Sequence, residues 1–225
     1  LSSAGDRVDI LAAFDAGDWC VVFRRWRLSR DMSKVETCGL EFAVYPSGIR
    51  EAEFPMTQPR DYAKTLAEAK ANDVADMYPD GWVIGADSIV WADEKLLEKP
   101  RSIDEARDMM AQLSGRTHYV FTGYAIVCKA RSHSFADVSG TAVTFKDLTP
   151  AEIEWYIATD EPYDKAGGYA IQGLGSFMIE RINGSYTNVV GLPLCEVMTH
   201  LIRQGVIVPD PEKQSWGNGM ATAGP

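Results

Sequence analysis

The stretch WVIGADSIVW at residues 82–91 is almost continuously apolar and is interrupted only by Gly85, Asp87 and Ser88. A short apolar run bounded by polar turns predicts a strand that is buried on both faces. An aspartate inside such a strand is costly unless a cation, a hydrogen-bond network or a metal compensates its charge. Two interpretations of Asp87 are therefore open: a salt-bridged structural carboxylate, or a catalytic or metal-binding one.

Helices and strands alternate on both sides of this stretch. Upstream, residues 40–46 alternate as a strand, and Pro59 opens a helix that we predict to end near Met77. The other predicted elements are a helix with a Ser102/Glu105 capping box, strands at 117–128 and 134–146, a helix with a Thr149/Glu152 capping box, a strand at 176–182 and a helix at 192–204. This alternation predicts an α/β protein.

Length and charge limit the class of protein. A chain of 225 residues predicts one domain, here residues 1–208, followed by a flexible polar tail at 209–225. The net charge of -10 argues against nucleic-acid binding but not against a small phosphate ligand, because a few lysines can reverse the field locally. The sequence contains neither a signal-peptide pattern nor an apolar run near the roughly 20 residues of a membrane span, so we expect a cytoplasmic protein without a membrane partner.

The cysteines and histidines predict no transition-metal site. The four cysteines (Cys20, Cys38, Cys128 and Cys195) include no Cys-x-x-Cys pair, and we expect them to be reduced. The three histidines form no local ligand pattern. Any metal ion would therefore be a hard divalent cation held by carboxylates and phosphate oxygens.

Two lysines and a glycine-rich loop could bind phosphate. Pro100 holds Lys99 extended, and Lys70 is the only basic residue between positions 67 and 80, although either lysine could equally be solvated. In the stretch DKAGGYAIQG at 164–173, the adjacent glycines could expose N–H groups to an anion, or the stretch could be an ordinary flexible loop. Its spacing matches neither the Walker nor the Rossmann motif.

Taken in order, these segments resemble the Maf family of nucleotide pyrophosphatases. The residues that carry the resemblance are GADSIV at 85–90, EKP at 98–100, LSG at 113–115, DKAGGY at 164–169, IQG at 171–173, GSY at 184–186 and NVVGLPL at 188–194. The similarity covers about residues 39–207.

The resemblance implies a fold and an activity. The fold would be similar to that of inosine-triphosphate pyrophosphatases, with a mixed twisted sheet flanked by helices and two lobes around a central cleft. The activity would be metal-dependent hydrolysis of a nucleoside triphosphate to its monophosphate and pyrophosphate, with Mg²⁺ or Mn²⁺, to clear non-standard nucleotides. The form of residues 164–173 is similar to the branch that acts on dTTP and UTP. The family also suggests a homodimer.

The resemblance assigns roles to individual residues. Asp87 would ligate the metal or activate water, and Glu51 would help to hold the metal. Lys70 and Lys99 would contact the phosphates, and Gln172 would lie at the nucleotide. The expected substrate-binding residues are Ser88, Lys165, Gly167, Gly168 and Arg30. Together these groups would neutralise the charge that builds on the departing pyrophosphate.

The N-terminal segment departs from the family. The usual Ser-x-Ser-Pro-Arg-Arg loop around the triphosphate is absent at residues 21–31, where Ser29-Arg30 could replace part of it. Either the reading frame upstream of Gly39 is wrong, which sequencing of the coding DNA would reveal, or the chain has diverged. Divergence would favour a nucleotide-binding protein with weak or lost catalysis. A third alternative is a pyrophosphatase with purine specificity.

Overall fold

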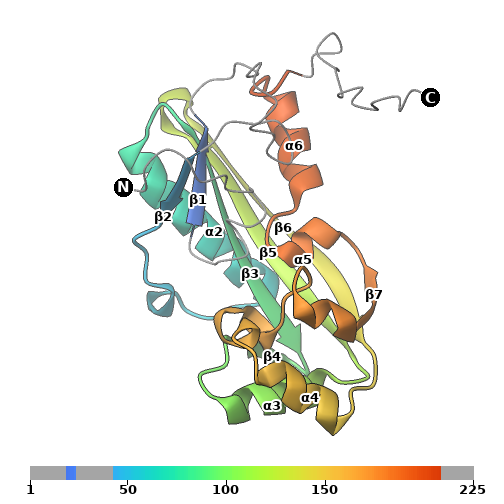
Figure 1. Ribbon diagram of the computed structural model, residues 1–225. Helices are drawn as coiled ribbons and strands as arrows, with labels where there is room; N and C mark the ends of the chain where they lie inside the picture. Colours follow the sequence, from blue (N-terminus) through green and yellow to red (C-terminus); the bar gives the residue numbers. More distant parts are fainter. Residues whose placement is uncertain (1–18, 24–42, 209–225) are drawn as a thin grey trace, which may run out of the picture.

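The computed structural model describes residues 19–23 and 43–208, which form one seven-stranded sheet with helices on both faces (Figure 1). The strands are β1 (Trp19–Phe23), β2 (Ala43–Pro46), β3 (Trp82–Ala92), β4 (Lys95–Leu97), β5 (Thr117–Cys128), β6 (His133–Phe145) and β7 (Ile179–Asn183). Their order is β2-β1-β3-β5-β6-β7, and β4 pairs with β3. The α/β class is thereby confirmed, with strands and helices close to the predicted bounds.

The predicted mixed sheet is wrong for the part of the chain that the structure describes, because every strand pairing there is antiparallel. The cause lies in the connections. β5 and β6 form a hairpin around a short turn at Lys129–Arg131, and the chain returns from β4 through a helix to enter β5 antiparallel to β3. A parallel pairing would require a crossover connection instead.

In the part of the chain that the structure describes, five α-helices flank the sheet: α2 (Pro59–Met77), α3 (Ile103–Leu113), α4 (Pro150–Ile157), α5 (Tyr186–Val190) and α6 (Leu194–Arg203). In the upper half of the molecule α2 covers one face of the sheet and α6 covers the other, whereas α3 and α4 lie together at the lower end (Figure 1). None of the helices in the described ranges combines the length and the apolar composition needed to cross a membrane.

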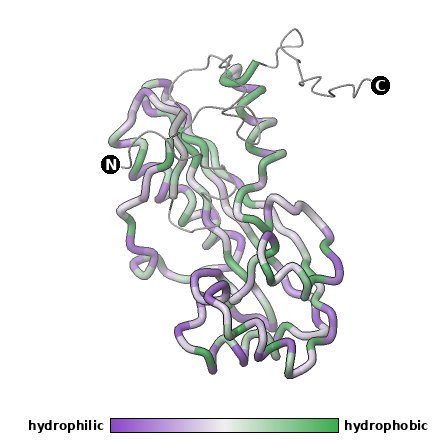
Figure 2. Tube along the Cα trace, viewed as in Figure 1, coloured by the Kyte–Doolittle hydropathy of each residue, from purple (hydrophilic) through white to green (hydrophobic). Residues whose placement is uncertain are grey.

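The apolar core is divided between the two ends of the long strands. At the upper end, side chains such as Ile84 and Ile126 pack against α6, and Val83 and Val127 pack under α2. At the lower end, Val90 packs with residues of α3 and α4. In Figure 2 the hydrophobic colour follows the central strands and α6, and the hydrophilic colour gathers on the outer loops. The long strands β3, β5 and β6 thus run through two lobes.

Helix α2 lies directly on the sheet because two strand residues have no side chain. A Cβ atom on Gly85 would be 2.7 Å from the carbonyl oxygen of Ala67, and one on Gly123 would be 2.2 Å from that of Ala63. Glycine is required where two backbones approach this closely. This contact brings residues in the middle of α2 next to the middle of β3.

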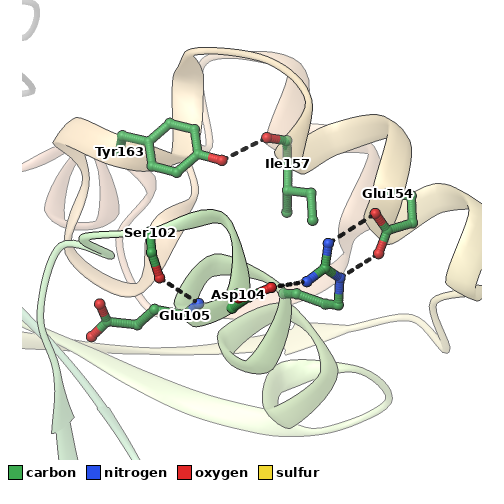
Figure 3. A network of polar contacts seen from close by, with 7 residues as sticks. Ser102, Asp104, Glu105, Glu154, Ile157 and Tyr163 are labelled. Carbon is green, nitrogen blue, oxygen red and sulfur yellow. Dashed lines mark hydrogen bonds and ion pairs between the residues drawn. The ribbon is translucent and has the colours of Figure 1, made fainter.

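Side-chain caps and ion pairs fix the lower lobe. The Thr149/Glu152 capping box at α4 is complete, as predicted. At α3 only half of the predicted box forms: the Ser102 hydroxyl accepts from the Glu105 N–H at 3.1 Å, but the Glu105 carboxylate accepts from the Arg101 N–H. Arg107 of α3 binds both Asp104 and Glu154, which ties α3 to α4 (Figure 3).

Three segments differ from the expectation. The predicted strand at 176–182 begins only at Ile179, because residues 174–178 form a 3₁₀ turn. The predicted helix from Leu192 begins at Leu194, and the short helix α5 lies where no element was predicted. Cys128 and Cys195 are free thiols, as predicted. Cys38, Arg30 and the tail at 209–225 lie outside the described residues.

Candidate active site

A cavity of about 550 Å³ opens at one edge of β3, beside residues 86–89. On this edge β1 pairs with residues 82–85 and β4 pairs with residues 90–92. Among the described strands none pairs with residues 86–89 on that side, and the cavity is lined there by Asp87 and Ser88. Its volume is within the range of small-molecule sites, which is roughly 300–1,000 Å³.

Asp87, Lys70 and Glu51 meet on the α2 side of this cavity. The Lys70 Nζ donates to Asp87 Oδ1 at 2.6 Å and also lies 2.7 Å from Glu51 Oε1. The exposed fraction of the side chain is 1% for Lys70, 9% for Asp87 and 44% for Glu51. The two carboxylates that the sequence assigned to one site therefore lie around a single ammonium group.

The charges in this cluster stabilise one another. Burial alone would lower the pKa of Lys70, but attraction to Asp87 and then to Glu51 outweighs burial and raises this pKa above its usual value. Lys70 is thus a cation at neutral pH, and it compensates the buried Asp87 charge. Asp87 fits both interpretations left open by the sequence, since it is ion-paired and also lines the cavity.

Tyr62 is a neighbour of this cluster that the sequence did not assign to the site. It lines the cavity one helical turn before Leu66. Its pKa is raised, first by burial and then by the negative charges of Glu51 and Asp87. Its position four residues before Leu66 in α2 is typical of a core-facing residue, so the sequence carries no signal that places Tyr62 at the site.

Two further lysines line the cavity from other elements. Lys99 is exposed after β4, in agreement with the solvated alternative for this residue. Lys165 is only 14% exposed, and its Nζ lies 2.9 Å from Asp164 Oδ2. The solvated alternative is wrong for Lys70, because α2 lies directly against the sheet. All three predicted lysines therefore surround one cavity.

The predicted anion-binding N–H groups of Gly167 and Gly168 require correction. The Gly167 N–H donates to the Glu98 carbonyl at 3.1 Å, and the Gly168 N–H donates to the Lys165 carbonyl at 3.0 Å. Both residues have φ of +71°, and a Cβ on Gly167 would be 2.9 Å from Val90. These glycines are needed for the conformation of the loop, which in turn places Lys165 at the cavity.

Gln172 and Glu161 lie in the next part of this loop. Gln172 is exposed and follows Ile171, which lines the cavity, but Gln172 itself is outside the lining. The Glu161 carboxylate accepts hydrogen bonds from the Tyr156 hydroxyl at 2.9 Å and from the N–H groups of Leu174 and Gly175 at 2.7 Å. No role was predicted for Glu161, because two of its three partners are backbone N–H groups 13 and 14 residues further along the chain.

The side of the cavity away from α2 is mostly apolar. It is formed by Tyr169, Ala170, Ile171, Val189 and Val190. Ser88 also lines the cavity, and its hydroxyl hydrogen bonds to that of Thr122 at 2.7 Å. The cavity thus has a charged side, which could hold a cation and phosphates, and an apolar side, which could hold a ring.

Comparison with known proteins agrees with this geometry. The family model described as Maf-like protein matches residues 32–204. The chain is 41% identical over 186 residues to the dTTP/UTP pyrophosphatase of Syntrophus aciditrophicus, covering 83% of this chain and 91% of the relative. It is 47% identical over 171 residues to the protein of that name from Syntrophotalea carbinolica, covering 75% and 78%. The Geobacter metallireducens protein of that name is 46% identical over 178 residues, covering 79% and 93%.

Proposed function

The chain belongs to the Maf-like protein family, and from this premise we propose that it hydrolyses dTTP and UTP to the nucleoside monophosphate and pyrophosphate. The observation that carries the proposal is the meeting of Asp87, Glu51 and Lys70 at the cavity. Two acidic groups and an ammonium group beside an apolar pocket suit a ligand that has both a polyphosphate and a ring.

The residues present fit a hard divalent cation such as Mg²⁺ or Mn²⁺. Asp87 Oδ1 and Glu51 Oε1 both lie within 2.7 Å of the same nitrogen, so they are close enough to share one ion. The described residues include no cluster of three or more His, Cys, Asp or Glu ligands. This set matches the usual protein site for Mg²⁺, in which one or two carboxylates act together with substrate phosphates and water.

In the proposed reaction water attacks the α-phosphorus, and the bond from the α-phosphorus to its bridging oxygen breaks. Pyrophosphate leaves with that electron pair. Asp87 is held as a carboxylate by Lys70 and accepts the proton of the attacking water. Lys99 and Lys165, which line the same cavity, neutralise the charge on the departing group. A bound divalent cation would supply further neutralisation of the phosphate oxygens.

Pyrophosphate release from dTTP, UTP and ITP, each with and without Mg²⁺, tests this function. We expect release from both pyrimidine nucleotides only when the metal is present. Binding of dTTP without product would identify a nucleotide-binding protein instead, and faster turnover of ITP would identify a purine enzyme.

Two properties, the homodimer suggested by the family resemblance and the location inferred from the sequence pattern, remain predictions. We expect a homodimer, which sedimentation analysis of the purified chain would reveal as twice the mass of 24.8 kDa. We also expect a cytoplasmic location, which fractionation of the producing cells would test.

A further inference from the structure

The hydrogen-bond direction at Ser88 can be deduced from its partners. Adjacent residues of a strand point to opposite faces, so Ser88 faces away from the α2 side on which Asp87 meets Lys70. The Ser88 Oγ lies 2.7 Å from the Thr122 Oγ1 of β5, and either hydroxyl could donate in this pair considered alone. The next contact of Thr122 removes that ambiguity.

Thr122 is completely buried and donates its only hydroxyl hydrogen elsewhere. Its Oγ1 lies 2.8 Å from the backbone carbonyl oxygen of Asn188, which can only accept. Thr122 must therefore accept from Ser88. The Ser88 hydrogen is directed into the protein, and the side of its oxygen that faces the cavity carries only lone pairs.

The acceptor that starts this relay is held in place. Asn188 is completely buried in α5, and its Nδ2 donates to the Val120 carbonyl and to Thr141 Oγ1, both at 3.0 Å. Two strands thus fix the position of α5. Because none of these groups is solvent-exposed, the direction of the Ser88 hydroxyl is set by the fold before any ligand arrives.

The substrates named for the relatives share one chemical feature that such an acceptor can recognise. dTTP and UTP differ at the ribose 2′-hydroxyl and at the 5-methyl group, so a site that takes both relies on neither. Both rings carry an N–H at N3 between two carbonyl groups, whereas cytosine presents a lone pair at N3. An acceptor favours the N–H and disfavours the lone pair.

Resting on the proposed function, we infer that Ser88 accepts the N3–H of uracil or thymine and that Thr122 is the positioning residue that fixes this polarity. Ser88 lies beside the apolar side of the cavity formed by Ile171, Val189 and Val190, where a pyrimidine ring can pack. Because the relay Ser88–Thr122–Asn188 directs the Ser88 hydroxyl hydrogen away from the cavity, Ser88 cannot donate to the N3 lone pair of cytosine, and CTP is disfavoured.

Thr122→Val tests the relay, because valine keeps the shape and removes the hydroxyl. The Asn188 carbonyl still accepts from the Gly191 N–H at 3.1 Å, so the change leaves no orphaned carbonyl. The Ser88 hydrogen becomes free to rotate toward the cavity and to meet the N3 lone pair of cytosine. We expect the UTP-to-CTP ratio of kcat/KM to fall about tenfold, the size of one hydrogen bond.

Thr122→Ser and Ser88→Ala complete the experiment. Thr122→Ser retains the hydroxyl and should keep the wild-type UTP-to-CTP ratio of kcat/KM. Ser88→Ala should lower kcat/KM for UTP without raising kcat/KM for CTP. An equal effect of Thr122→Val on both nucleotides, or a wild-type protein without preference for UTP over CTP, would overturn the inference. If the wild type releases no pyrophosphate, the proposed function fails, and the same ratio is then measured from UTP and CTP binding by calorimetry.

Discussion

Two adjacent residues of β3, Asp87 and Ser88, lie on opposite faces of the sheet and differ in charge and in how their neighbours hold them. On the α2 face, Asp87 is charged and is stabilised by the buried ammonium group of Lys70. On the opposite face, Ser88 is neutral and is oriented by the buried hydroxyl of Thr122. In the proposed function the charged face supplies the groups for bond cleavage, and in the further inference the neutral face recognises the base. On this proposal, the alternation of side chains along one strand separates catalysis from base selection.

Replacement of Asp87 should have the largest effect. Asp87→Asn removes the charge and proton-accepting ability while keeping the shape, and we expect kcat to fall by about 10²–10³ with the fold retained. Ser88→Ala, one residue away, is the matched change on the neutral face, and we expect it to lower kcat/KM for UTP only about tenfold. Steady-state kinetics with circular dichroism checks both variants. Equal losses, or unchanged kinetics in Asp87→Asn, would contradict the division between the faces.

Replacement of Lys70 should lower the free energy of unfolding, because the charge of Asp87 on the same face is then no longer compensated. Lys70→Met leaves Asp87 buried without its cation, and we expect a loss of about 3 kcal/mol in the free energy of unfolding. Urea unfolding measures this loss, and Mg²⁺ should restore part of it by taking over the compensation. Lys99→Met is the control, because Lys99 lines the same cavity but is exposed, and its stability should hardly change. Similar stability of the two variants would argue against a buried charge cluster.

Two glycines with similar backbone angles separate the effect of backbone strain from that of a steric clash. Gly167 lies in the loop that carries Lys165, and Gly205 follows α6. Gly167→Ala introduces a Cβ at φ of +71° and 2.9 Å from Val90, whereas Gly205→Ala introduces one at φ of +64° with nothing within 4 Å. We expect about 1 kcal/mol of destabilisation for Gly205→Ala from strain alone, and about 1–3 kcal/mol more for Gly167→Ala. Thermal unfolding measures both. Turnover should fall only in Gly167→Ala, and equal behaviour would remove the packing argument.

The comparison between the faces also shows which parts of the fold and of the site can be predicted from the sequence. Strand β3, helix α2 and the β5–β6 hairpin were predicted because each has its own period or turn residues. The meeting of Glu51 and Asp87 was available only through the family resemblance.

The remaining features depend on contacts between distant segments. Lys70 is buried because Gly85 and Gly123 let α2 rest on the sheet, and a local pattern does not reveal which glycines meet a helix. The roles of Thr122 and Glu161 were missed for the same reason. Thr122 donates to the carbonyl of Asn188, which lies 66 residues further along the chain, and Glu161 accepts from the N–H of Leu174, which lies 13 residues further along.

A pH experiment tests the layer behind the apolar side of the cavity, where His118 contacts the Tyr169 hydroxyl at 2.7 Å. Burial lowers the pKa of His118 to about 4, below its usual value of 6.5. The unfolded chain therefore binds a proton in this interval while the folded chain does not, so stability is complete above about pH 6.5 and declines as the pH falls toward 4.

His118→Gln isolates this effect from the other histidines. His133 and His200 have pKa values that are also lowered, first by burial, and they act in the same direction. The variant keeps them and removes only the proton uptake of His118. We expect the melting temperature of the wild type to fall more steeply between pH 6.5 and 4.5 than that of the variant, as measured by calorimetry. Parallel slopes would mean that His118 can take up a proton in the folded protein, and that the layer behind Tyr169 is less rigid than its burial indicates.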